Sequence, residues 1–211
     1  MKQTLKTIIR NVKSINGNSL AEFATTTALM ATLAATAAPK LSEMSEGTMA
    51  EKSKNEMDKI LTQARNHYQT TSNEEGRGRF PGQDKYNLAV GSYSNEDDVI
   101  TDLANWTTYD NAIGAKWCSV FGITNAAAPK HTDCKVVNDV ITTHSGNGGA
   151  QLGHVEWLAL FAENTLTSKY QDGHFAYAVV PGGGQGKSAY PPVMYVVDVE
   201  NASDFNNVIE P

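Results

Sequence analysis

A single carboxylate, Glu22, stands at the start of an uncharged apolar stretch that runs from Phe23 to Ala38. A charged side chain at such a place costs on the order of 2–3 kcal/mol in a membrane, so a partner of opposite charge is expected. The alternative is that Glu22 lies at a membrane surface and extends its carboxylate into water. Charge pairing and interfacial placement are the two roles that the residue types suggest here.

The chain has two cysteines, Cys118 and Cys134. In an exported protein they would most simply form a disulfide that closes a loop of about 15 residues and contributes about 3 kcal/mol. In a cytosolic protein they would be two unrelated thiols. His131 and Asp133 lie beside Cys134, but these residues lack the paired spacing of structural zinc sites. We predict a disulfide between the cysteines, no metal site and no cofactor.

A glycine-rich segment, GGGQGKS at 182–188, resembles a phosphate-binding loop at first sight. That motif needs a glycine where Pro181 stands, and it needs a helix directly afterwards. Tyr190 and two prolines follow instead, and then a strand pattern. The segment is therefore predicted to be a flexible hairpin loop.

Three acids near the C-terminus, Asp198, Glu200 and Asp204, are candidates for calcium binding. Their spacing is poor support for a site, and a solvated acidic face is the preferred interpretation. The sequence also lacks a Gly-x-Ser-x-Gly nucleophile motif, so we do not predict an enzyme.

The charge of the chain is unevenly distributed. Its 211 residues have a formal net charge of −6, which argues against a nucleic-acid partner because phosphate binding needs a basic face. Residues 1–17 contain four basic residues and no acid, so their removal takes the net charge from −6 to −10. A basic head on an acidic body is typical of a targeting segment on an exported domain.

The basic head lacks the apolar run that a secretory signal peptide places before its cleavage site, because that run comes later, at 23–38. Sixteen helical residues span roughly 24 Å, less than the ~30 Å of a typical hydrocarbon core. The run is also diluted by threonines, namely Thr25, Thr26, Thr27, Thr32 and Thr36. Such a helix suits a segment that sits in a membrane and is later withdrawn.

The stretch Gly17-Asn18-Ser19-Leu20-Ala21-Glu22-Phe23, followed by the apolar run and Pro39, resembles the precursor signature of type IV pilins and pseudopilins. In that family a basic leader ends in glycine, and glutamate stands fifth in the mature chain. A proline often stands twenty-second, and counting from Asn18 places Glu22 and Pro39 at these positions. Leu33-Ala34-Ala35 also matches, and Glu22-Phe23 is similar to the pair in the tight-adherence branch. The Asn18 start and the threonine-rich helix depart from the usual apolar pattern.

The resemblance implies cleavage after Gly17 by a prepilin peptidase, and then pairing of Glu22 with the Asn18 amine of a neighbouring subunit. It implies a helix bend at Pro39, and a membrane-anchored precursor that inner-membrane machinery assembles with identical subunits into an extracellular filament. We expect a structural pilin of this kind. One alternative is a pseudopilin of a secretion machine. Another, from a different class, is an anchored binding protein or enzyme whose N-terminus matches by chance.

The expected organisation is a cleaved leader at 1–17, a long helix at 18–70 whose part at 18–38 lies in the membrane or filament core, and an α+β domain at 71–211. A helical stripe of apolar residues marks the second half of the long helix: Met57, Ile60, Leu61, Ala64 and Tyr68. Gly47 is a weak point that favours a break near 45–48. The three tryptophans, Trp106, Trp117 and Trp157, are predicted to anchor the core.

The domain is predicted to contain an antiparallel sheet. We expect a helix that starts near Ser94 and strands at 117–123, 175–180 and 192–199. Residues 154–166 are apolar enough for a buried strand or helix, and their length favours a helix. Residues 135–143 suit either a strand or a helix, and 201–211 is expected to be a short polar tail.

Overall fold

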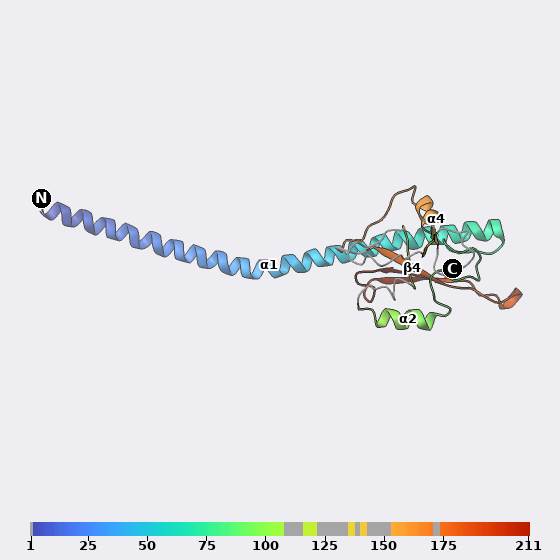
Figure 1. Cartoon of the computed structure of the whole chain (residues 1–211). Helices are drawn as coiled ribbons and strands as arrows, with labels where there is room; N and C mark the ends of the chain where they lie inside the picture. Colours follow the sequence, from blue (N-terminus) through green and yellow to red (C-terminus); the bar gives the residue numbers. More distant parts are fainter. Residues whose placement is uncertain (1, 108–115, 122–134, 138–139, 143–152, 171–173) are drawn as a thin grey trace. The chain divides into compact units, whose positions relative to one another are not determined.

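A computed structural model describes residues 2–107, 116–121, 135–137, 140–142, 153–170 and 174–211. The chain forms two compact units, Met1–Thr48 and Met49–Pro211. Helix α1, Lys2–Glu75, provides all of the first unit and the opening of the second (Figure 1).

In the first unit the backbone is helical throughout the described residues, and the helix passes through Pro39 and Gly47 without interruption. The break that the sequence predicts near Gly47 is therefore absent from this described stretch. Around these two residues stand alanine, leucine, methionine, lysine and glutamate, which have high helix propensity and offset the cost of one proline and one glycine.

The second unit is built on a four-stranded antiparallel sheet in the order β1-β4-β5-β6. The strands are β1 (Cys118–Ser119), β4 (Phe175–Val180), β5 (Val193–Asp198) and β6 (Asn206–Ile209). In the central pair, Phe175 lies opposite Asp198 and Val180 opposite Val193. Together with the long helix, this sheet confirms the predicted α+β fold.

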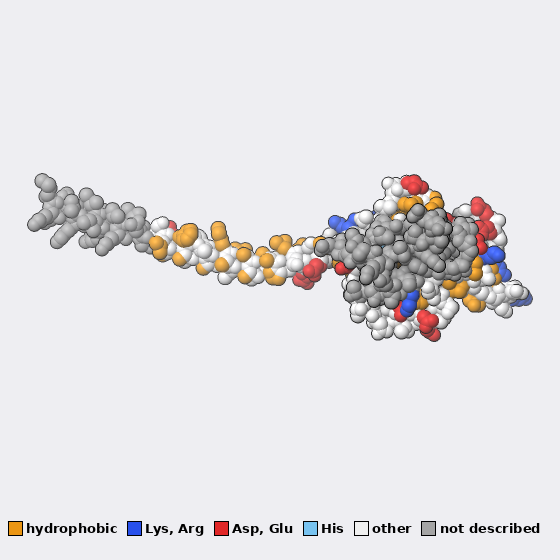
Figure 2. Space-filling model, viewed as in Figure 1, with side chains coloured by type: hydrophobic (Ala, Val, Ile, Leu, Met, Phe, Trp, Pro, Cys, Tyr) orange, Lys and Arg blue, Asp and Glu red, His pale blue; other side chains and the backbone are white. Residues whose placement is uncertain are grey.

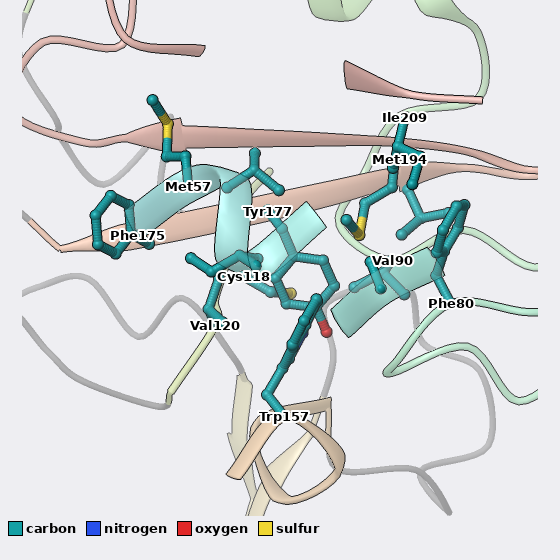
Figure 3. Close-up of a cluster of buried hydrophobic side chains, with 14 of the residues drawn as sticks. Met57, Phe80, Val90, Cys118, Val120, Trp157, Phe175, Tyr177, Met194 and Ile209 are labelled. Carbon is teal, nitrogen blue, oxygen red and sulfur yellow. The ribbon is translucent and has the colours of Figure 1, made fainter. Parts of the chain in front are cut away.

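Each face of the sheet is covered by a helix, because alternate residues of a strand point to opposite faces. Phe175, Tyr177 and Val179 of β4 pack in one cluster with the α1 stripe (Figure 3). The intervening residues of β4 pack in a second cluster with Val99 and Leu103 of α2 (Glu96–Ala104). Near-continuous apolar strands such as FAYAVV are thereby explained, since both of their faces are buried.

The α1 stripe is confirmed as the packing face. Met57, Ile60 and Ala64 are buried, and Leu61 and Tyr68 are partly buried against the same cluster. All three tryptophans are buried as predicted.

Helix α2 begins where the sequence predicts. The Asn95 side chain accepts a hydrogen bond from the backbone N–H of Asp98 at 2.9 Å and caps the helix, and acids fill the first turn. Val99 and Leu103 form its buried face, whereas Ile100 is 55% exposed.

The remaining elements resolve two ambiguous segments. Residues from the 135–143 segment form a strand pair, β2 (Lys135–Val137) and β3 (Val140–Thr142). Helix α4 occupies Gly153–Leu160, the first half of the helix predicted at 154–166.

The C-terminal segment corrects a prediction. Instead of a polar tail, it contains β6, which pairs with β5 and buries Ile209. The amide of Asn207 also donates to the carboxylate of Asp58 on α1, at 3.4 Å. The sequence NNVI does not indicate a strand, because its two asparagines are unfavourable in strands and leave only a weak apolar pattern.

The glycine-rich segment lies in the predicted hairpin between β4 and β5, but it is more ordered than a flexible loop. It contains a bridge between Gly183 and Tyr190 and a short 3-10 turn, η1 (Gly186–Ser188). A β-carbon at Gly184, whose φ is +74°, would lie 2.1 Å from the carbonyl oxygen of Ser188. This glycine is required by the close fold of the loop itself rather than by a phosphate.

Candidate assembly and membrane segment

The first unit exposes an unusual amount of apolar surface. Every side chain from Ser19 to Thr48 is exposed, and the large apolar ones are 63–75% accessible. They are Leu20, Phe23, Leu29, Met30, Leu33, Leu41 and Met44 (Figure 2). Full burial of one such side chain contributes about 1.5–3 kcal/mol, so this surface strongly favours an apolar environment.

Among the described residues, α1 is the one helix long and apolar enough to cross a membrane, judged by length and composition. Its apolar stretch is not amphipathic in the manner of a surface helix, because alanine, leucine, methionine and threonine occur on all sides. A helix of this kind suits a lipid bilayer or a surround of other helices.

The threonines in this stretch donate their hydroxyl groups to backbone carbonyl oxygens of the preceding helical turn. Thr26 donates to the carbonyl oxygen of Glu22 at 2.9 Å, Thr27 to that of Phe23 at 2.7 Å, and Thr36 to that of Thr32 at 3.0 Å. Each hydroxyl proton thus has an acceptor within the helix, as a lipid environment requires. The threonine content that departs from the pilin pattern is therefore compatible with an apolar surround.

Glu22 lies at the polar end of this stretch. Its side chain is exposed, and its carboxylate forms no ion pair with any residue whose side chain the structure describes. The backbone of Gly17 and Asn18 continues the same helix. Five helical residues from Asn18 to Glu22 rise about 6 Å, so the two positions lie within two turns of each other.

Pro39 lies inside α1. It has no N–H, so the carbonyl oxygen of Ala35 lacks its usual helical donor, and the helix has one backbone hydrogen bond fewer there. The bend predicted for Pro39 stays a prediction.

Cys118 is buried in β1, opposite Tyr177 of β4. Cys134, with His131 and Asp133, lies outside the described residues, so the predicted disulfide stays a prediction. The described residues contain no group of three His, Cys, Asp or Glu side chains placed to hold a metal ion.

The acids near the C-terminus do not form a common solvated face, because Asp198 is fully buried. Its carboxylate accepts a hydrogen bond from the Ser168 hydroxyl at 2.6 Å and another from the backbone N–H of Glu200 at 3.3 Å. Burial raises the pKa of Asp198 above its ordinary value, although these hydrogen bonds oppose the shift. Asp204 instead accepts from the side chain of Asn201.

A polar network around Arg79 has no signal in the sequence. The Arg79 guanidinium contacts Glu156 of α4 at 2.9 Å and Glu75 of α1 at 3.2 Å, and it donates to the carbonyl oxygen of Gln83 at 3.0 Å. Desolvation lowers the pKa of Arg79, but the two carboxylates outweigh it and raise the pKa overall. Glu75 is a local partner, but Glu156 lies 77 residues from Arg79, a separation that no local pattern reveals.

Comparison with known proteins leaves the family open, since no family model, curated protein or solved structure matches the chain.

Proposed function

We propose that this chain is a pilin-like subunit of an extracellular filament. It is cut after Gly17 by a prepilin peptidase, and it assembles with identical subunits through the apolar part of α1. The observation that carries the proposal is the exposed segment from Ser19 to Thr48. Its apolar run at 23–38 is preceded by the Glu22 carboxylate, which has no ion-pair partner among the described side chains. A basic segment ending in glycine directly precedes it.

In this proposal the stretch first anchors the precursor in the inner membrane and then packs among the same helices of neighbouring subunits. Cleavage frees the amine of Asn18, which carries a positive charge that is costly in an apolar bundle. The Glu22 carboxylate of a neighbour neutralises it. Removal of one partner from such a pair leaves an uncompensated buried charge, so the pair fixes the stagger of the subunits.

Two other functions fit the exposed helix. A pseudopilin of a secretion machine would form short filaments by the same chemistry, and filament length at the cell surface distinguishes it from a pilin. A singly anchored binding protein or enzyme would use the apolar stretch alone. The positions of Gly17, Glu22 and Pro39 relative to one another favour assembly over simple anchoring, because an anchor has no need of a carboxylate there.

The proposal is tested by replacing Glu22 in the full chain. With Glu22→Ala we expect normal cleavage but a loss of at least about 100-fold in sheared filaments, because an unpaired buried charge costs about 3–5 kcal/mol. Glu43→Ala is the matched control, since Glu43 is an exposed glutamate of the same helix outside the 23–38 run. It is expected to assemble normally.

The measurements are the amount of filament protein in the supernatant, and the intact mass and N-terminal residue of the protein there. Wild-type protein should start at Asn18. Normal filaments from Glu22→Ala would contradict the assembly role, and a surface protein that still starts at Met1 would contradict the processing step.

A further inference from the structure

A polar groove of about 430 Å³ lies in the second unit, between the end of α1, the segment that follows it and the β4–β5 hairpin. The end of α1 and the tip of this hairpin lie at the same end of the unit (Figure 1). Three tyrosines and one arginine line the groove, namely Tyr68, Tyr86, Tyr190 and Arg77. The volume falls within the range typical of small-molecule sites.

Two of the tyrosines lie close to glycine backbone in the groove, and the third forms a hydrogen bond there. A β-carbon at Gly78 would lie 2.3 Å from the ring of Tyr68, and one at Gly183 would lie 2.3 Å from the hydroxyl of Tyr190. The Tyr86 hydroxyl donates to the carbonyl oxygen of Gly184 at 3.2 Å. The absence of side chains at these glycines leaves room for the rings of Tyr68 and Tyr190 beside the backbone, and the hydrogen bond orients Tyr86.

Tyr190 nevertheless remains 59% exposed, an unusual value for a ring that the hairpin packs so closely on one side. The free side of such a ring is suited to contact with flat apolar faces of a ligand, while its hydroxyl can exchange hydrogen bonds. Gly76 and Gly186 also line the groove, and a β-carbon at either would meet no atom within 4 Å.

Arg77 supplies the charge of the groove. Its guanidinium lies over the Tyr86 ring at 4.5 Å from the ring centre. No carboxylate among the described side chains forms an ion pair with it. Its positive charge also acts on Tyr68, where it opposes the rise in pKa that burial causes. Stacking on a ring leaves the N–H edge of a guanidinium free, and this edge matches a carboxylate in bidentate geometry.

We propose that this groove binds a saccharide that carries a carboxylate, such as a uronic acid unit. A pyranose ring presents a flat face of C–H groups for Tyr190 and a rim of hydroxyl groups for the polar lining. A carboxylate on the ring would pair with Arg77. All of these residues belong to the second unit, so the inference is independent of the proposed assembly through the first.

The test uses the full chain in detergent and isothermal titration with disaccharides of galacturonate, glucuronate and mannuronate. Each acidic disaccharide is paired with the neutral disaccharide of the same linkage. Glutarate serves as a carboxylate without a sugar ring. We expect at least one acidic disaccharide to bind at least about 10-fold more tightly than its neutral counterpart and than glutarate. The neutral disaccharide lacks the carboxylate that pairs with Arg77, and glutarate lacks the sugar ring that contacts Tyr190.

Four variants locate the site. Arg77→Gln and Tyr190→Ala should each weaken binding about 10-fold or more, whereas Tyr190→Phe, which keeps the ring, should stay within about 3-fold. Arg65→Gln removes an exposed arginine outside the groove and should bind as the wild type does. Far-ultraviolet circular dichroism checks that each variant is folded.

Three results would overturn the proposal. They are no binding of any acidic disaccharide at about 10 mM, equal binding of glutarate, or unchanged binding by folded Arg77→Gln.

Discussion

Asp198 shows how a single buried carboxylate can set the pH response of the second unit. It lies at the end of β5 on the α1 face of the sheet, with the Ser168 hydroxyl at 2.6 Å. Ser53 of α1 also acts as a hydrogen-bond partner, and His174 acts on it electrostatically. The pKa is raised because burial outweighs all of these interactions. The folded state therefore holds the Asp198 proton more tightly than the unfolded chain does.

From this direction of shift, we expect the free energy of unfolding to fall as pH rises from about 4, the ordinary pKa, through the folded-state pKa of Asp198. Asp198→Asn should flatten this part of the profile, because asparagine has no proton to release and still accepts the Ser168 hydroxyl. Denaturant titrations between about pH 4 and 8, followed by fluorescence of the three buried tryptophans, measure the effect. An unchanged slope in the variant would contradict the assignment.

At the scale of elements, the Arg79 network adds polar contacts between three segments that also meet in the hydrophobic core. Arg79 connects the end of α1 to α4 through Glu156, whose second oxygen accepts the backbone N–H of Gly82 at 2.6 Å. The hydroxyl of Thr71 on α1 bonds both the N–H and the carbonyl oxygen of Arg79. These hydrogen bonds hold the backbone of the segment after α1, which includes the groove residue Arg77.

Arg79→Met should destabilise the unit by about 3 kcal/mol, because it leaves a largely buried Glu156 without its cation. The double variant with Glu156→Gln should cost less than the sum of the two single variants. Tryptophan-fluorescence denaturation measures both quantities.

The matched control is Lys59→Met, which breaks the Lys59–Glu56 pair. Its lysine side chain is 57% exposed, against 11% for Arg79, so the change in stability should be less than about 0.5 kcal/mol. A similarly small change in the free energy of unfolding for Arg79→Met would show that the network does not stabilise the unit.

The elements differ in how well the sequence predicts them, and the reason is the range of their interactions. The α1 stripe and the Asn95 cap depend on neighbours three or four residues away, so a periodic pattern reveals them. Strands β4 and β5 are visible because their apolar runs are long. Strand β6 is not visible, because its pairing with β5 decides its structure and its own residues are half polar.

The candidate sites follow the same rule. The stretch from Gly17 to Pro39 is contiguous, so its features can be counted along the chain. The Arg77 groove and the Arg79 network bring together residues that are far apart in sequence, and nothing in the local composition of either segment indicates a partner. The sequence predicts a solvated acidic face that includes Asp198, whereas its position in β5 buries this residue.

At the scale of the whole molecule, the two units make opposite use of apolar residues. The second unit encloses its apolar side chains in two clusters around one sheet, which draw on residues from Met57 to Ile209. In the first unit, the described side chains from residue 19 onward remain exposed. Folding of the second unit therefore needs no side chain of the first.

We expect residues 49–211, produced alone, to be soluble and folded, with a melting temperature within about 5 °C of the same transition in the full chain, a shift that corresponds to less than about 2 kcal/mol. A chain that begins at residue 60 is the matched control. It lacks Met57 and Ser53, which are buried against the sheet, and should be clearly less stable. Thermal unfolding followed by tryptophan fluorescence distinguishes these outcomes, and an unfolded 49–211 chain would contradict the independence of the unit.

The late position of β6 has a consequence for the order of events during synthesis. The core that contains Met57 closes only when β5 and β6 pair, at the very end of the described chain. At translation rates of about 5–20 residues per second, the apolar N-terminal stretch leaves the ribosome roughly 10–30 s before that strand exists. During this interval the nascent chain exposes its apolar helix while the second unit is still unfolded, so it is prone to aggregate. If a carrier or a membrane binds the N-terminal helix early, the apolar helix is already covered when the second unit folds.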